Sequence, residues 1–94
     1  MSKRFELGRI MATAGVHAMK EENIEFAKFV SDSFMRYMTG DWGDTCPEGA
    51  KLNDESVENG ERILAVYIFD NSITIWIITE WDRSATTILF PEEY

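Results

Sequence analysis

The sequence is poor in the residues that hold metals and form covalent links. Its 94 residues include one cysteine, Cys46, and one histidine, His17. A single thiol excludes an internal disulfide, and this pair leaves no cysteine and histidine cluster for structural zinc. A catalytic pair of Cys46 and His17 is disfavoured because the carboxylates of Asp44 and Glu48 discourage the thiolate that a nucleophile needs. We therefore expect no metal and no cofactor.

Long apolar runs and positive charge are also scarce. No stretch approaches the ~20 apolar residues of a membrane span, and Lys3 and Arg4 precede no apolar run of the kind a signal peptide needs. Seventeen acidic residues against nine basic ones give a formal net charge of -8 at pH 7, which repels phosphate backbones. We expect a cytoplasmic protein that binds neither membranes nor nucleic acid directly, and whose partners are neutral or basic.

The stretch that predicts the centre of the fold is residues 72–79, with four isoleucines and one tryptophan. Such a run is typical of a strand with apolar residues on both faces. Two further stretches have the same character, and the three strands are predicted at residues 61–69, 72–79 and 85–90. The turn at residues 70–72 tolerates positive φ and makes the first two a hairpin. Residues 5–12 are interpreted as an edge strand, with Gly8 at a bulge or a close backbone approach. We predict one domain, residues 1–94, with an antiparallel sheet.

Residues 24–38 form the one clear amphipathic helix of the sequence. Asn23 is a good N-cap, and Gly40 supplies the left-handed residue that ends the helix. The apolar stripe recurs at three- and four-residue spacing and consists of Ile24, Phe26, Ala27, Val30, Phe34, Tyr37 and Met38. Trp42 follows between two glycines and is expected to fold back over the core edge, with its indole N–H bonded to a carbonyl.

The remaining helical signals are weak. Thr13 is a candidate N-cap for a short helix that continues through residue 20 and has Val16 and Met19 on its apolar side. Residues 44–59 are polar and are interpreted as a mobile loop with one weak helical segment over 50–58. With the sheet, these elements predict the α+β class, in which one long helix and one short helix pack on an antiparallel sheet.

One polar cluster is the candidate functional site. It brings seven hydrogen-bonding side chains within nine positions, namely Thr79, Glu80, Asp82, Arg83, Ser84, Thr86 and Thr87. The simplest interpretation is a structural turn in which Arg83 makes a salt bridge with a neighbouring carboxylate. A recognition surface is the second interpretation. The third is a pair of carboxylates, Glu80 and Asp82, that acts in acid and base catalysis or holds a hard cation.

The C-terminal run from Ile78, ITEWDRSATTILFPEEY, resembles a family of short bacterial proteins of plasmids and other mobile elements. Members usually end in ITEADRS, two threonines, an apolar run and PEEY, and they share an opening like FELGRIMATAG and a GDWG. Here Trp81 replaces a common alanine, Ala14 replaces a common proline, and the segment around residues 46–53 differs. The resemblance implies a plasmid-related accessory protein with no assigned activity.

Members of that family are often labelled as a subunit of a type I restriction enzyme. A methyltransferase subunit needs a cofactor-binding α/β domain of much greater length, with a glycine-rich turn after a strand. This chain of 94 residues has no such turn. We therefore do not expect methyltransfer.

Three functions follow as hypotheses. The first is a non-enzymatic accessory protein of a mobile element that acts by binding another protein. The second is an acidic inhibitor of a host defence nuclease, which imitates DNA charge and requires carboxylates in a row on one face. The third is a small hydrolase or metal-dependent enzyme that uses Glu80 and Asp82, with His17 brought close by the fold.

Assembly is the last expectation. A sheet with two apolar faces and one convincing helix leaves residues such as Tyr67 and Trp76 in need of cover. A symmetric homodimer would provide it by presenting the same patch twice. The alternative is that the short helix with Val16 and Met19 closes the second face of a monomer.

Overall fold

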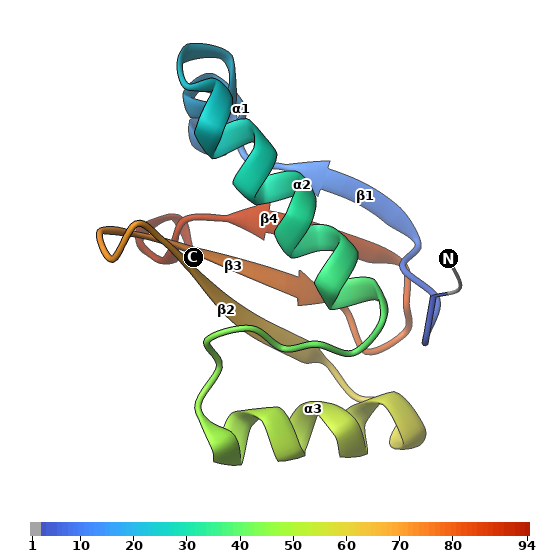
Figure 1. Ribbon diagram of the computed structural model, residues 1–94. Coiled ribbons are helices and arrows are strands. Elements are labelled where there is room, and N and C mark those ends of the chain that lie inside the picture. The colour runs from blue at the N-terminus through green and yellow to red at the C-terminus, as the bar shows by residue number, and fades with distance from the viewer. Residues whose placement is uncertain (1–2) are drawn as a thin grey trace.

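The structure is a computed structural model that describes residues 3–94. It has the predicted α+β class, with α2 crossing one face of a four-stranded sheet and α3 lying beside β2 (Figure 1). In chain order the elements are β1 (Arg9–Ala12), α1 (Ala14–Glu22), α2 (Ile24–Met38), α3 (Pro47–Asn59), β2 (Ile63–Phe69), β3 (Ile73–Thr79), β4 (Ala85–Leu89) and the 3-10 helix η1 (Pro91–Glu93). Of the helices described, none combines the length and apolar character needed to cross a membrane.

The strand order is β1-β4-β3-β2, which places β3 inside the sheet as predicted. β2, β3 and β4 form an antiparallel meander, and Asp70 (φ 53°) and Asn71 (φ 56°) make the predicted left-handed turn between β2 and β3. β1, however, runs parallel to β4, so the expectation of a wholly antiparallel sheet is wrong at this edge. Parallel neighbours need a crossover connection, and here three helices and two strands lie between β1 and β4.

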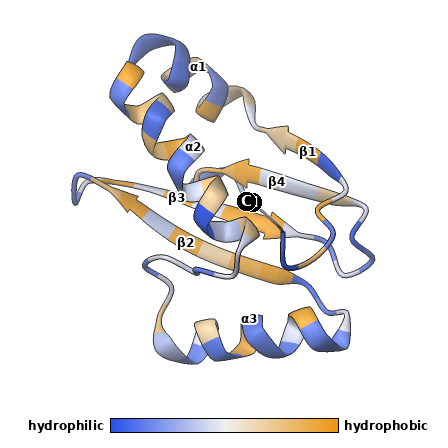
Figure 2. Ribbon diagram, turned by 45° about the vertical axis from the view of Figure 1, so that its right-hand side comes forward, coloured by the Kyte–Doolittle hydropathy of each residue, from blue (hydrophilic) through white to orange (hydrophobic). Residues whose placement is uncertain are grey.

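α2 begins and ends where the sequence predicts. The side chain of Asn23 accepts hydrogen bonds from the backbone N–H groups of Glu25 and Phe26, at 3.0 and 3.1 Å. Its buried apolar residues are Phe26, Val30 and Tyr37, which pack on the meander. Ile24 is 85% exposed and does not belong to the stripe. Figure 2 shows apolar residues concentrated along the strands, whereas α3 is mostly hydrophilic.

The N-terminal strand is shorter than predicted. Phe5 and Leu7 bury their side chains in the core, but they do so from an irregular segment, and β1 begins at Arg9. Gly8, with φ of 64°, turns the chain between Leu7 and Arg9. It lies against the backbone of Ser84, which is the close backbone approach that the sequence predicted. The left-handed residue ends the extended conformation on its N-terminal side, which is why the strand cannot start earlier.

The polar stretch after Trp42 is a regular helix over most of its length, so the predicted helical segment over residues 50–58 is confirmed, whereas the expectation of a loop is wrong for residues 47–49 and 59. α3 runs from Pro47 to Asn59, with the Cys46 thiol as N-cap and Gly60 as the left-handed C-cap. It packs beside β2 through hydrogen bonds, together with two partly buried apolar residues, Ala50 and Val57. The Asn53 side chain donates to the carbonyl of Leu64 at 2.9 Å and accepts from its N–H at 3.3 Å. Because the helix has few apolar residues, the sequence indicated only residues 50–58 and not its full length.

Trp42 covers the core edge as predicted, but its indole N–H bonds a carboxylate instead of a carbonyl. The Trp42 ring is buried against Phe5 and Tyr37. Its Nε1–H donates to Oδ1 of Asp54 at 3.0 Å, and Arg4 donates to the same oxygen at 2.9 Å. These two hydrogen bonds hold the pKa of Asp54 below its usual value, and they connect α3 to the segments before β1 and after α2.

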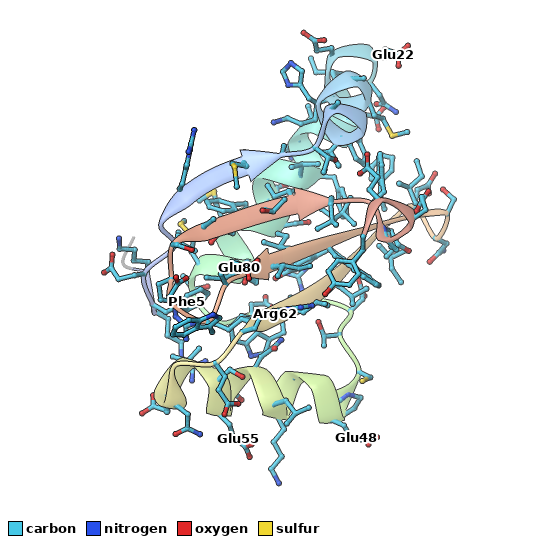
Figure 3. The ribbon with its side chains drawn as sticks, turned by 180° about the vertical axis from the view of Figure 1, so that it is seen from behind. Phe5, Glu22, Glu48, Glu55, Arg62 and Glu80 are labelled. Atoms are coloured by element: carbon cyan, nitrogen blue, oxygen red, sulfur yellow. The ribbon has the colours of Figure 1, made fainter. Side chains whose placement is uncertain are left out.

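Among the residues that the structure describes, no α-helix crosses the second face of the sheet (Figure 3), although the short 3-10 helix η1 contacts β3. Tyr67 lies on the face covered by α2, whereas Trp76 lies on the second face. Tyr94 packs edge-on against Trp76 at 5.6 Å between ring centroids, and the guanidinium of Arg62 lies over the Tyr94 ring. α1 packs against α2 and buries Val16 in the same core, so it does not close the second face.

Candidate functional site

The turn between β3 and β4 is a short, internally bonded loop. The N–H of Glu80 donates to the carbonyl of Ala85 at 3.0 Å, and the N–H of Arg83 donates to the carbonyl of Glu80 at 2.9 Å. Arg83 adopts a left-handed φ of 60°. The hydroxyl and the backbone N–H of Ser84 both donate hydrogen bonds to the carboxylate of Asp82, and these bonds lower the pKa of that carboxyl. The turn therefore has a defined shape, with a carboxylate that stays ionised at neutral pH.

Arg83 makes no salt bridge with Glu80 or Asp82 in the part of the chain described, so that prediction is wrong. Its guanidinium donates instead to backbone carbonyls, at 2.7 Å to Glu61, 2.8 Å to Ser56 and 3.2 Å to Glu80. Ser56 lies in the last turn of α3, where carbonyls lack helical partners and the helix dipole favours a cation. Arg83 thereby fixes the turn against the C-terminal end of α3.

Thr79 and Thr86 belong to the core and not to a recognition surface, because both side chains are fully buried. The hydroxyl of Tyr37 bonds that of Thr79 at 2.6 Å, and Thr79 bonds Thr86 at 2.8 Å. Thr86 Oγ1 donates to the carbonyl of Leu7 at 2.7 Å. Burial raises the pKa of the Tyr37 hydroxyl, so it stays protonated. This hydrogen-bonded chain connects α2, β3, β4 and the N-terminal segment.

We predict that Thr79→Val destabilises the protein by about 1–3 kcal/mol, because it leaves the buried Tyr37 hydroxyl without a partner while preserving side-chain shape. Thr87→Val is the matched control, since Thr87 is half-buried on the second face of β4, and it should change stability by less than about 0.5 kcal/mol. Urea unfolding of both variants measures the difference. Equal free energies of unfolding for the two variants would show that the buried hydrogen bonds of Tyr37, Thr79 and Thr86 do not stabilise the protein.

Four residues of the turn stay exposed and are called here the hinge surface: Glu80, Trp81, Asp82 and Ser84. Trp81 is 66% exposed, although tryptophan is one of the largest apolar side chains. The sequence interpretation named its three neighbours but missed Trp81 itself. The sequence signal that could have identified Trp81 as exposed is its position between two carboxylates inside a turn, where no face of a strand or helix can bury it.

The structure does not bring His17 to the two carboxylates. β1 starts beside Ala85 and ends beside Ile88, and α1 follows, so His17 lies at the far end of β4 from the turn. Its ring nitrogen is 3.7 Å from Glu21. Within residues 3–94 no three His, Cys, Asp or Glu side chains gather as a metal site would require. The geometry that the enzyme hypothesis needs is not found there.

Carboxylates lie in several separate parts of the molecule. Figure 3 shows Glu22 at one end of the molecule, Glu48 and Glu55 at the opposite end, and Glu80 near the sheet between them. A protein that imitates DNA needs carboxylates in rows spaced like phosphates. This distribution gives no support to the hypothesis of an acidic nuclease inhibitor.

Comparison with known proteins adds no family to this geometry. No protein-family model matches the chain, and neither a curated protein nor a solved structure matches it significantly. The resemblance of the sequence to short plasmid-related proteins therefore stays a prediction.

Proposed function

We propose that this is a non-enzymatic accessory protein of a bacterial mobile element that acts in the cytoplasm by binding another protein through the hinge surface. The observation that carries the proposal is the exposed Trp81, presented on a turn that Arg83 and Ser84 hold in place. Tryptophan dominates the binding energy of many protein interfaces because it buries a large apolar area with little loss of side-chain entropy. The resemblance of the C-terminal run supports the assignment to mobile elements, whereas Trp81 replaces a common alanine of that family, so the contact made by Trp81 would be particular to this chain.

The chemistry of the hinge surface defines the kind of partner. Trp81 needs an apolar pocket, and the exposed carboxylates of Glu80 and Asp82 on either side favour basic side chains at its rim. The net charge of -8 acts in the same direction by attracting a basic protein over a longer range. We therefore infer a partner with an apolar pocket in a basic surface.

The fixed shape of the turn also favours binding. A partner that meets a mobile loop must order it, which costs about 0.5–1.5 kcal/mol for each side chain immobilised. Here the turn is closed by two backbone hydrogen bonds and attached to α3 through Arg83 before any partner arrives. Most of the binding energy of Trp81 is then available for affinity.

The test is capture of partners from the host with the tagged protein, at low and moderate salt. We expect Trp81→Ala to weaken the complex by about 30-fold, since a central tryptophan contributes about 2 kcal/mol or more. Glu80→Gln with Asp82→Asn should weaken capture mainly at low salt, because rim charges act chiefly on association and are screened.

Ile24→Ala is the matched control, because Ile24 is 85% exposed on α2 and lies outside the hinge surface. It should capture the same protein as the unmodified chain. A partner that binds all variants equally would reject the hinge surface, and no specific partner at either salt concentration would reject protein binding as the function.

A further inference from the structure

The two edges of the sheet differ in whether their outward backbone groups are hydrogen-bonded. At the β2 edge, the outward backbone groups of Leu64, Val66 and Ile68 are bonded by side chains and backbone of the segment before and within α3. Thr45 Oγ1 accepts from Val66 N–H at 2.8 Å, and Asp44 Oδ2 accepts from Ile68 N–H at 2.8 Å. This edge is closed to any further strand.

The β1 edge is open. The N–H of Arg9 donates to the carbonyl of Ser84, directly before β4, and the N–H of Thr13 donates to the carbonyl of Ile88 in β4, both at 3.0 Å. These bonds show that the backbone groups of every second residue, beginning with Arg9, face β4. The N–H and C=O groups of Ile10 and Ala12 consequently point away from the sheet. Within residues 3–94 nothing bonds these outward groups, and Ile10 and Met11 are 54% and 40% exposed. An apolar, unprotected edge is a template for another strand.

We propose that β1 is a dimer interface, at which the β1 strands of two copies pair antiparallel about a two-fold axis at Met11. In this register Ile10 lies opposite the partner's Ala12 on both sides of the axis. Each of these two pairs exchanges two N–H···O=C bonds, so all four outward groups of each strand segment are satisfied. The two sheets become one continuous sheet of eight strands.

The side chains suit a second copy of the same chain. Met11 of each copy meets the partner's Met11 across the axis, which buries an exposed apolar side chain in each. On the other face, Ile10 borders a groove that is also lined by Phe34, Ser31 and Lys20. The added strand would lay its own Ile10 and Ala12 along this side and cover apolar surface that is now half-exposed.

Charge complementarity at the β1 edge favours a second copy over an unrelated strand, and it acts locally against the long-range repulsion between two chains that each carry a net charge of -8. Arg9 has no ion-pair partner among the residues described, and in the proposed register it lies opposite the partner's Thr13. The hydroxyl of Thr13 donates to Glu93 at 2.6 Å, a bond that lowers the pKa of this exposed carboxyl and keeps it ionised. Each end of the paired strands therefore brings Arg9 of one copy next to Glu93 of the other.

The test is sedimentation of the full chain from micromolar to submillimolar concentration. We expect conversion from 10.8 kDa to a dimer of 2 × 10.8 kDa, about 21.6 kDa. Ala12→Pro removes one interface N–H donor from each copy, two of the four, and removes no hydrogen bond between β1 and β4. Ile10→Lys places a positive charge on the edge strand of each copy. Each should raise the dimer Kd by at least about tenfold. Arg9→Gln should raise it by about 3- to 10-fold and remove the salt dependence that the contact with the partner's Glu93 contributes.

Ile24→Lys and Lys51→Glu are the matched controls, because both residues are exposed on helices away from β1. They should leave the Kd unchanged. Amide exchange gives an independent readout, since the Ile10 and Ala12 N–H groups should become protected as concentration rises. A monomer at every concentration would overturn the proposal, as would a dimer that Ala12→Pro and Ile10→Lys do not weaken. Neither result would bear on the hinge surface.

Discussion

Ile75→Asp is expected to unfold the protein. Ile75 is fully buried in β3, between β2 and β4 and beneath α2. An aspartate there would have to be ionised without a partner or protonated without a hydrogen-bond acceptor, and both states cost several kcal/mol. The lost contacts of isoleucine add about 2–5 kcal/mol. Together these costs match most of the ~5–14 kcal/mol of unfolding free energy that a domain of this size has.

The control for this substitution is the same exchange at an exposed position. Ile24→Asp places the carboxylate in the first turn of α2, where the helix dipole favours negative charge. We expect this variant to be soluble and to melt within a few degrees of the unmodified protein. Circular dichroism and thermal melting compare the two. If Ile75→Asp melts at the temperature of the unmodified protein, the central position of β3 in the sheet is contradicted.

Gly8→Ala is expected to have the second-largest effect. A Cβ at residue 8 would press against the Arg83 carbonyl and lie 2.5 Å from the Ser84 carbonyl oxygen. These are backbone atoms and cannot rotate away. The φ of 64° adds a cost of about 1–2 kcal/mol for any L side chain, so the total should reach about 3–4 kcal/mol.

Gly60→Ala separates the cost of the steric contact from the cost of the positive φ. Gly60 has a similar φ of 72°, but a Cβ there would meet nothing within 4 Å. It should therefore cost about 1 kcal/mol, from backbone conformation alone. Urea unfolding gives both values. Equal costs for the two alanines would show that residue 8 does not lie against the turn.

The sequence predicted those elements in which several local signals agree. The long helix has a capping Asn23, an apolar stripe and a closing Gly40, and its observed bounds equal the predicted ones. The β2–β3 hairpin has two dense apolar strands and residues suited to positive φ in its turn. Each signal fixes backbone conformation independently of distant contacts, which is why the prediction succeeded.

Elements that depend on distant partners were predicted only in part. α3 is held by polar side chains such as Asn53, which bonds the edge of β2, so it carries little apolar periodicity. The direction of β1 depends on how the chain returns to β4, which no local pattern encodes.

The candidate site was predicted in part for the same reason. Glu80, Asp82 and Ser84 are exposed as the recognition interpretation requires. Arg83 bonds backbone carbonyls, which no sequence pattern displays. The burial of Thr79 had a usable signal, because it follows Ile75 and Ile77 at the two-residue spacing of one strand face.

Two contacts from other segments hold the turn between β3 and β4 in place. Gly8 permits the N-terminal segment to lie against Ser84, and Arg83 attaches the turn to α3. Both contacts fix the position of Trp81 without covering it. A substitution that loosens either contact should weaken partner binding through the order of the turn, even though it removes no atom of the hinge surface.

The most direct test of the central claim, that the hinge surface binds a protein, is photo-crosslinking in the host. The photoreactive amino acid p-benzoylphenylalanine replaces Trp81 in one variant and the exposed Ile24 of α2 in another. The account predicts a covalent adduct with one specific protein from position 81 and none from position 24. Absence of an adduct at position 81, or the same adducts from both positions, would contradict it.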